Sequence, residues 1–187
     1  MSRGQYPATR MRRNRMKAFS RRMLAENRVS VDDLIWPLFV IEGEDRAEAV
    51  TAMPGVSRHS IDRLVGQAQE AGRRGIPAIA IFPSIDAALK DNDGTLAGDP
   101  DNLVCRAVRA VKAACPDLGV ICDVALDPFT DNGHDGILRD GEIVNDATLE
   151  ALCRQALCQA DAGCDLSLIH ISEPTRQADS AYAGCCV

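Results

Sequence analysis

Apolar residues gather in four short runs, separated by longer stretches in which polar and apolar positions alternate with helical spacing. The runs span residues 34–41, 78–82, 119–126 and 166–171. Nearly unbroken apolar runs of this length are typical of strands that are buried on both faces. Pro37 interrupts the first run and indicates an edge position or an irregularity, because proline has no N–H group for the ladder.

Three amphipathic stretches between the runs predict helices at residues 61–74, 103–115 and 147–162. Ser60 and Asp146 are suitable N-caps for the first and third helices, and a glycine or a proline follows each helix. The apolar positions that we expect on the third helix are Leu149, Leu152, Cys153, Ala156, Leu157 and Ala160.

Strands that alternate with helices predict an α/β fold with a parallel sheet, and the strand starts lie 41 to 47 residues apart. Two architectures fit this pattern: an open doubly wound sheet, or part of a (β/α)₈ TIM barrel. The first crossovers lack a glycine-rich phosphate-binding motif, which argues against a dinucleotide-binding fold. A complete barrel needs about 250 residues, so this chain would supply the first three to four βα units.

Charge divides the chain into a basic arm and an acidic body. Residues 1–28 hold nine basic side chains and one acidic side chain, whereas the rest holds twelve basic and twenty-six acidic ones. The arm is a solvated tail, a segment that docks on a neighbouring subunit, or an organelle transit peptide that is unusually poor in serine. We therefore expect an arm at residues 1–32, the first part of a barrel at 33–165 and a separate tail at 166–187.

The composition excludes several classes of protein. With 187 residues, 46% of them apolar and 26% charged, the chain can build one hydrophobic core. No apolar run approaches the roughly 20 residues of a membrane span, and residues 1–28 contain no secretory apolar segment. We therefore expect a cytoplasmic protein without membrane contact. The formal charge of −6 argues against nucleic acid as a partner.

The densest polar cluster follows the third apolar run. If the strand continues to residue 126, Asp123, Ala125 and Asp127 share one face at its carboxyl end, where parallel barrels place their active sites. The glycine-rich loop after it returns His134 and Asp135 towards the same place. Carboxylates gathered at one point need a hard cation, a basic side chain or a shared proton, so we expect a functional site here.

A calcium loop is the alternative interpretation of this segment. Residues 131–142 match the D-x-[DN]-x-[DN]-G-x₅-E pattern except at Gly133, which has no side-chain oxygen. A calcium hand also needs an entering helix, whereas the preceding residues are expected to form a strand. A calcium-binding module therefore remains the second hypothesis.

Several short motifs occur in a specific order along the chain. They are RRNR at 12–15, FSRR at 19–22, LIWPLFV at 34–40, MPGV at 53–56, GIP at 75–77, DVALDPFT at 123–130 and GHDG at 133–136. From about Tyr6 to Asp165, this ordered set resembles the δ-aminolevulinic acid dehydratase (porphobilinogen synthase) family. The resemblance implies a lyase that joins two 5-aminolevulinate molecules into porphobilinogen with loss of two waters, in haem and tetrapyrrole biosynthesis. It also implies a (β/α)₈ barrel, an arm that wraps a neighbouring subunit, and a homo-octamer.

The resemblance assigns roles to the aspartates. Asp123 matches the family's strand aspartate, which lies near the reacting lysines. Zinc-using members carry three cysteines where this chain has Ala125, Asp127 and Asp135, so it resembles the aspartate-rich class, which lacks the catalytic zinc and is often stimulated by magnesium. Hard carboxylate oxygens also favour Mg²⁺ over zinc on physical grounds.

Residues 166–187 depart from the family pattern. The family's two Schiff-base lysines, its substrate ligands and its magnesium-binding glutamate all lie beyond this point. The lysines of this chain are Lys17, Lys90 and Lys112, and none matches a Schiff-base lysine. Because imine formation requires such an amine, we expect this chain to be inactive by itself. A non-catalytic barrel fragment that binds a full-length partner is a further alternative.

Overall fold

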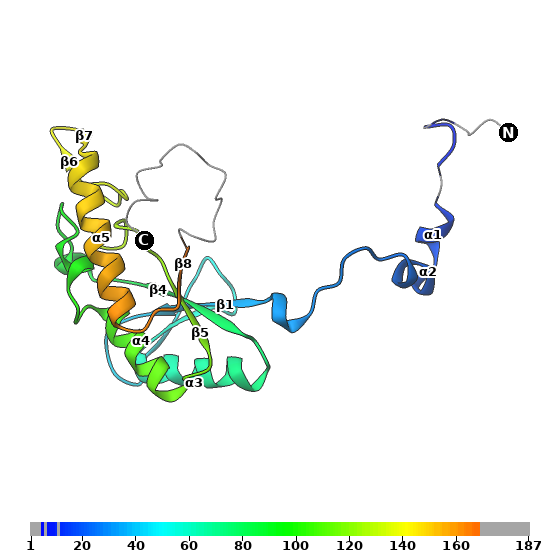
Figure 1. The fold of residues 1–187 in the computed structure, drawn as a ribbon, viewed down its shortest axis with the longest axis horizontal. Helices are drawn as coiled ribbons and strands as arrows, with labels where there is room; N and C mark the ends of the chain where they lie inside the picture. The colour runs from blue at the N-terminus through cyan, green and yellow to red at the C-terminus, as the bar shows by residue number, and fades with distance from the viewer. Residues whose placement is uncertain (1–4, 6, 11, 169–187) are drawn as a thin grey trace. The chain divides into compact units, whose positions relative to one another are not determined.

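The computed structural model describes residue 5, residues 7–10 and residues 12–168. It divides into two units at the boundary between Asp33 and Leu34 (Figure 1). The first unit contains two short helices, α1 (Arg13–Met16) and α2 (Ala18–Met23), and the 3₁₀ turn η1 (Val31–Asp33). None of the residues in these elements is buried within the described part of the chain.

The second unit is built on one twisted sheet. Its strands are β1 (Ile35–Val40), β2 (Ala47–Ala49), β3 (Ser57–His59), β4 (Ala78–Pro83), β5 (Gly119–Cys122) and β8 (Leu166–Ser167), in the order β2-β3-β1-β4-β5-β8. The pairs β1–β4, β4–β5 and β5–β8 are all parallel, so each main strand lies beside the next one along the chain. The predicted α/β fold with a parallel sheet is confirmed.

Three helices connect the parallel strands: α3 (Ile61–Arg73), α4 (Leu103–Ala114) and α5 (Asn145–Asp161). The longer connections also contain 3₁₀ turns η2 (Ala87–Leu89) and η3 (Thr95–Gly98), and a small hairpin of β6 (Leu138–Arg139) and β7 (Glu142–Ile143). Among the described residues, no helix is both long and apolar enough to cross a bilayer.

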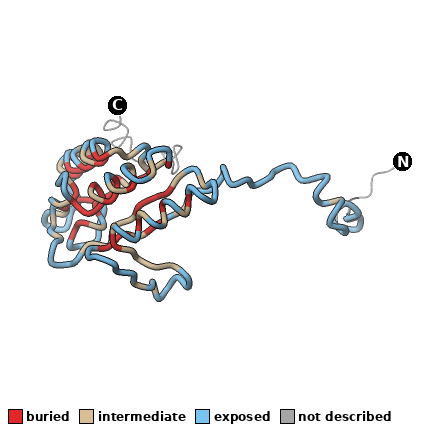
Figure 2. Tube along the Cα trace, turned by 90° about the horizontal axis from the view of Figure 1, so that it is seen from below, coloured by how far each residue is buried: buried red, intermediate tan, exposed pale blue. Residues whose placement is uncertain are grey.

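The helices pack on one face of the sheet, where Figure 2 shows most of the buried positions. The strand residues of this core are Leu38, Val40, Ile79, Ile81, Val120 and Cys122. The opposite face is more open: the rings of Phe39 and Phe82 lie 5.8 Å apart there, and Ile35 at the start of β1 is 45% exposed. The expectation that the first strand is buried on both faces is therefore wrong, because the described helices cover one face.

Pro37 occupies a position of β1 that has a neighbouring strand on one side alone, which agrees with the predicted edge position. It lies level with Ala80 of β4 on one side, whereas β3 reaches only Phe39 and Val40 on the other side. The missing N–H group of Pro37 therefore removes no ladder bond to β3.

The third strand is shorter than predicted. Its ladders with β4 and β8 both end at Cys122, and residues 123–126 leave the sheet. Backbone N–H groups of Phe129 and Thr130 then donate to the Leu126 carbonyl and close a turn around Pro128. The fourth predicted strand, 166–171, is present as β8, and its residues 169–171 lie outside the described part of the chain.

Helix α5 presents only part of the predicted face to the core, where Leu152 is buried and Ala156 packs against it. Leu157 is 65% exposed and Ala160 is exposed, whereas Gln155 and Gln159 are buried. Hydrophobicity alone predicts that the two glutamines are exposed. They are buried because backbone carbonyls beyond the end of β5 need hydrogen-bond donors, and the glutamine amides supply them.

Asn102 holds the start of α4 and provides a test of this packing. Its side-chain oxygen accepts from the Cys105 N–H at 2.9 Å, and its amide donates to the Ala97 carbonyl at 3.1 Å. Asn102→Ala should lower the free energy of unfolding by about 1–3 kcal/mol, because it removes the cap and leaves a buried carbonyl unpaired.

Urea denaturation measures this change, and Asp86→Ala is the matched control. Asp86 caps η2 in the same way but is exposed, so its removal should cost less than about 0.5 kcal/mol. Equal losses for the two variants would contradict the role of burial at Asn102.

Candidate active site

The candidate site lies beyond the carboxyl end of β5 and comprises residues 123–135, called here the 123–135 segment. A second loop, which follows β4, packs against it: the Asp91 N–H donates to the Phe129 carbonyl at 3.4 Å, and the Asp131 N–H donates to the Asp91 carbonyl at 3.1 Å. Both loops follow carboxyl ends of parallel strands, the edge of a sheet where α/β enzymes build their sites.

Asp123 is the half-buried carboxylate of the segment. Burial raises the pKa of Asp123 from 3.8 to about 6, and the charges of Asp127 and Asp135 add to the shift. The structure therefore brings the three predicted aspartates within electrostatic reach of one another. A carboxyl group that titrates near neutral pH can both give and accept a proton under ordinary conditions.

Asp135 is held by the backbone at the base of its loop. Its Oδ1 accepts a hydrogen bond from the Leu126 N–H, which opposes the rise in pKa that the burial of this carboxyl group produces. Asp135 as a whole residue is exposed, although its Oδ1 contacts the Leu126 backbone. Because burial of the carboxyl group outweighs this hydrogen bond, the pKa of Asp135 is raised. The Thr130 hydroxyl donates to the His134 carbonyl at 2.7 Å and fixes the turn before it.

The predicted common face for Asp123, Ala125 and Asp127 holds only in part. Ala125 is buried at 8% exposure and Asp127 is exposed. Side chains alternate strictly only within a ladder, and this ladder ends at Cys122. His134 is also exposed, and its backbone N–H donates to the side-chain oxygen of Asn132 at 2.7 Å.

The donor chemistry of the site suits a hard cation, since Asp123, Asp127 and Asp135 offer only oxygen. In the part of the chain that the structure describes, however, no three His, Cys, Asp or Glu side chains are arranged to hold a metal ion.

The calcium-loop alternative gains no support from the flanking structure. Residues 131–142 follow β5 and a turn, and they continue into the β6–β7 hairpin. Within this stretch the Asp135 carboxylate is engaged by the Leu126 N–H.

Sequence reasoning missed two residues that contact the segment, Gln155 and Gln159. The Gln159 side-chain amide donates to the Asp123 carbonyl at 2.8 Å, and the Gln155 amide donates to the Ala125 carbonyl at 3.0 Å. Their spacing of four residues within an apolar helix is the pattern that could have revealed them.

Comparison with known proteins identifies a family that this chain matches. A family model described as delta-aminolevulinic acid dehydratase matches residues 8–171. This chain belongs to that family. The matched region extends beyond Asp165, where the sequence resemblance was expected to end.

Individual relatives agree with the family match. The delta-aminolevulinic acid dehydratase of Bradyrhizobium diazoefficiens is 54% identical over 159 residues, and that of Rhodobacter capsulatus is 40% identical over 161 residues. These alignments cover 85% and 86% of this chain but 45% and 48% of the relatives. The chain thus spans about half the length of the curated relatives it matches.

A solved structure shows the same fold. The delta-aminolevulinic acid dehydratase (porphobilinogen synthase) of Toxoplasma gondii, in complex with the reaction product porphobilinogen, superposes with a TM-score of 0.79 at 42% sequence identity. The superposition covers 85% of this chain and 46% of that chain.

The raised pKa of Asp123 predicts a pH-dependent stability. Because the folded state holds this proton more tightly than the unfolded state, Asp123 weakens the fold as the pH rises from about 4 to about 6. Asp123→Asn should therefore be more stable than the parent chain at pH 7 by about 1–2 kcal/mol, after allowance for partial exposure.

Urea denaturation at pH 4 and pH 7 tests this expectation. The advantage of Asp123→Asn should vanish at pH 4, where the parent carboxyl is also neutral. Asp117→Asn, at an exposed turn, is the control and should change stability by less than about 0.5 kcal/mol at both pH values. A variant that is less stable than the parent at pH 7 would contradict the assignment.

Proposed function

We propose that this chain is the N-terminal half of a porphobilinogen synthase, a lyase that condenses two 5-aminolevulinate molecules to porphobilinogen with loss of two waters. The observation that carries the proposal is the family match over residues 8–171, supported by a similar structure that contains the product porphobilinogen. The aspartates beyond β5 would then lie at the active site of a tetrapyrrole-forming enzyme.

Asp123 would serve proton transfer in this reaction. Loss of two waters requires protons to move on and off oxygen, and a carboxyl group with a pKa of about 6 does this near neutral pH. The Leu126 N–H, which holds Asp135, would keep the second carboxylate in place beside it.

The covalent step needs an amine, and by the sequence resemblance none of Lys17, Lys90 and Lys112 matches a Schiff-base lysine of the family. The Lys112 ammonium donates to the carbonyls of Pro116 and Leu118 and pairs with Asp165 at 3.1 Å. These partners surround the amino end of β5, opposite to Asp123. Lys17 lies on the arm, and Lys90 ends the η2 turn in the loop that packs against the 123–135 segment. The chain alone is therefore proposed to be inactive.

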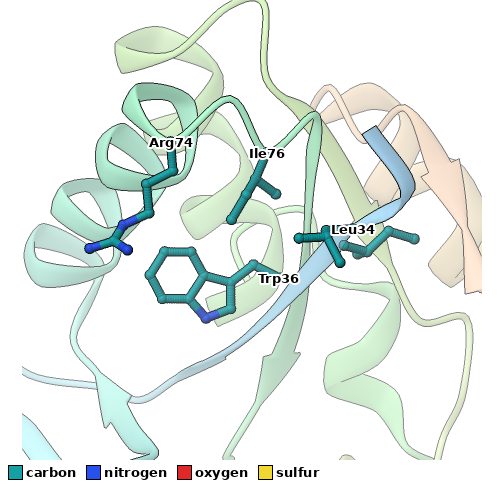
Figure 3. A pocket seen from close by; sticks show the side chains of 5 residues that line it. Leu34, Trp36, Arg74 and Ile76 are labelled. Atoms are coloured by element: carbon teal, nitrogen blue, oxygen red, sulfur yellow. The ribbon is translucent and has the colours of Figure 1, made fainter. Parts of the chain in front are cut away.

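We further propose that the sheet is the first part of a (β/α)₈ barrel. In such a barrel each parallel strand lies beside the next along the chain, as β1, β4, β5 and β8 do here. The edge of β1 that β3 leaves unpaired borders a cavity of about 460 Å³, lined by Leu34, Ile35, Trp36, Arg74 and Ile76. Figure 3 shows the Trp36 indole between Arg74 and Leu34, a surface that the second half of the barrel would cover.

A complementation experiment tests both the function and the barrel. We mix this chain with the second half of the Bradyrhizobium relative, which would supply the missing lysines. Porphobilinogen should form, and the emission of Trp36, the sole tryptophan, should shift to shorter wavelength as the cavity is covered. Borohydride with 5-aminolevulinate should trap an adduct on the added half and none on this chain.

The control for complementation is Trp36→Phe, which should keep activity and lose the fluorescence change. An adduct on Lys90 or Lys112 of the isolated chain, together with porphobilinogen formation, would contradict the proposed inactivity. Assembly without any porphobilinogen would argue against the synthase.

The metal preference is also proposed from the aspartates. By the sequence resemblance, Asp127 and Asp135, with Ala125, match the positions at which zinc-class members carry cysteines, so the complemented enzyme should do without the catalytic zinc and respond to Mg²⁺. A zinc-selective chelator should leave its activity unchanged, and added Mg²⁺ should raise it.

The matched variant for the metal test carries cysteines at positions 125, 127 and 135, and it should acquire zinc dependence because thiolates are soft ligands. Loss of the parent activity on chelation, with recovery only in zinc, would reject the aspartate class.

The arm is proposed to join subunits of a homo-oligomer. Its apolar side chains Phe19 and Leu24 are 62% and 54% exposed within the described residues, which leaves them available for a neighbouring copy. Exposed charge pairs contribute only about 0–1 kcal/mol each, so these packed contacts should dominate.

Deletion of residues 1–28 should lower the assembly state of the complemented enzyme in sedimentation velocity. The double variant Phe19→Ser and Leu24→Ser should act in the same direction, whereas Arg15→Gln should have little effect. An unchanged sedimentation profile after the deletion would count against this role.

A further inference from the structure

The inference concerns the backbone where β5 leaves the sheet. Beyond Cys122 the carbonyl groups no longer face a neighbouring strand, so they need donors from elsewhere. Residues of the buried face of α5 supply them: the Gln159 amide donates to the Asp123 carbonyl at 2.8 Å, and the Gln155 amide donates to the carbonyls of Ala125 at 3.0 Å and Asp123 at 3.4 Å.

The same helix face also holds the far end of the segment. The Thr148 hydroxyl accepts from the Ile137 N–H at 3.0 Å, two residues beyond Asp135. Thr148, Gln155 and Gln159 are spaced by seven and four residues, which places them on one stripe of the helix. They are 3%, 1% and 3% exposed, so the stripe lies inside the protein.

Stability alone does not explain two glutamines at these positions. Within the described residues, the Oε1 atoms of Gln155 and Gln159 are buried without a hydrogen-bond partner. An unpaired buried acceptor destabilises the fold, so each glutamine offsets part of the stability that its amide gains by binding a buried carbonyl. What the glutamines contribute is the position of the carbonyls that they bind.

We propose that Gln155 and Gln159 are positioning residues that hold the backbone of Asp123 and Ala125, and through it the carboxyl group of Asp123, at the active site. The catalytic part of this inference rests on the proposed function. Neither amide touches a carboxylate, so the residues act through the backbone.

The first experiment uses the isolated 187-residue chain, labelled with ¹³C and ¹⁵N. Gln159→Met should shift the Asp123 carbonyl resonance upfield, because it removes the hydrogen bond to that carbonyl. Gln155→Met should shift the Ala125 carbonyl resonance upfield, and more strongly than it shifts the Asp123 resonance, because its bond to Ala125 is the shorter one. The Leu126 amide should exchange about fivefold faster as the segment loosens. Leu152→Met, fully buried on the same face, is the control and should change neither carbonyl.

The thermal midpoints of both methionine variants should fall but remain clear cooperative transitions, since each variant leaves a buried carbonyl without its donor and loses a buried unpaired oxygen that offsets part of this cost. Unchanged carbonyl resonances would overturn the proposal. Loss of the folded state in both variants, but not in Leu152→Met, would also overturn it, because the glutamines would then serve the fold itself.

The second experiment uses the complemented enzyme. Gln155→Met should lower kcat about tenfold to a hundredfold while KM changes little, because misplacement of a reacting group affects the chemical step. Shifted carbonyls with an unchanged kcat would overturn the catalytic part. Shifted carbonyls in a complemented parent that makes no porphobilinogen would instead reject the proposed function and leave the amide contacts established.

Discussion

The arrangement of the candidate site depends on the residue at which the β5 ladder ends. Up to Cys122 the backbone is fixed by β4 and β8 on its two sides. After it, the chain must find new partners while it remains largely buried. Turn bonds at Leu126, the loop after β4 and the amides of α5 provide them, and together they determine where the carboxylates lie.

This constraint also explains the electrostatics. A chain that leaves a sheet beneath a helix carries its side chains into a region of low water content, where like charges interact strongly. Asp123 is half-buried there and holds its proton up to a pKa of about 6, whereas Asp127 reaches solvent. Carboxylates that look equivalent in the sequence therefore differ in how far they are buried.

The order and type of the main elements could be predicted because each depends on local pattern. Ser60 before an amphipathic stretch and the apolar run at 78–82 indicate α3 and β4 from nearby residues alone. The end of β5 could not be predicted, because it depends on pairing with strands that are distant in the sequence: β4 continues to Pro83, but its ladder with β5 ends at the pair Ile81 and Cys122. The prediction that Leu157 is buried is wrong for a related reason. The buried face of its helix is determined by carbonyls about thirty residues earlier that need donors, and the spacing of apolar residues contains no information about them.

Asp165 forms hydrogen bonds with both backbone polar groups of Val120 in β5. Its N–H donates to the Val120 carbonyl at 2.9 Å, and its carboxylate accepts from the Val120 N–H at 2.8 Å and from Lys112. These bonds fix where β8 starts and in which direction it runs, and they do not depend on the side chains of β8. The residue after Asp165 is consequently a natural crossover point for chimaeras, where recombination between related genes can exchange the following strand and preserve its register.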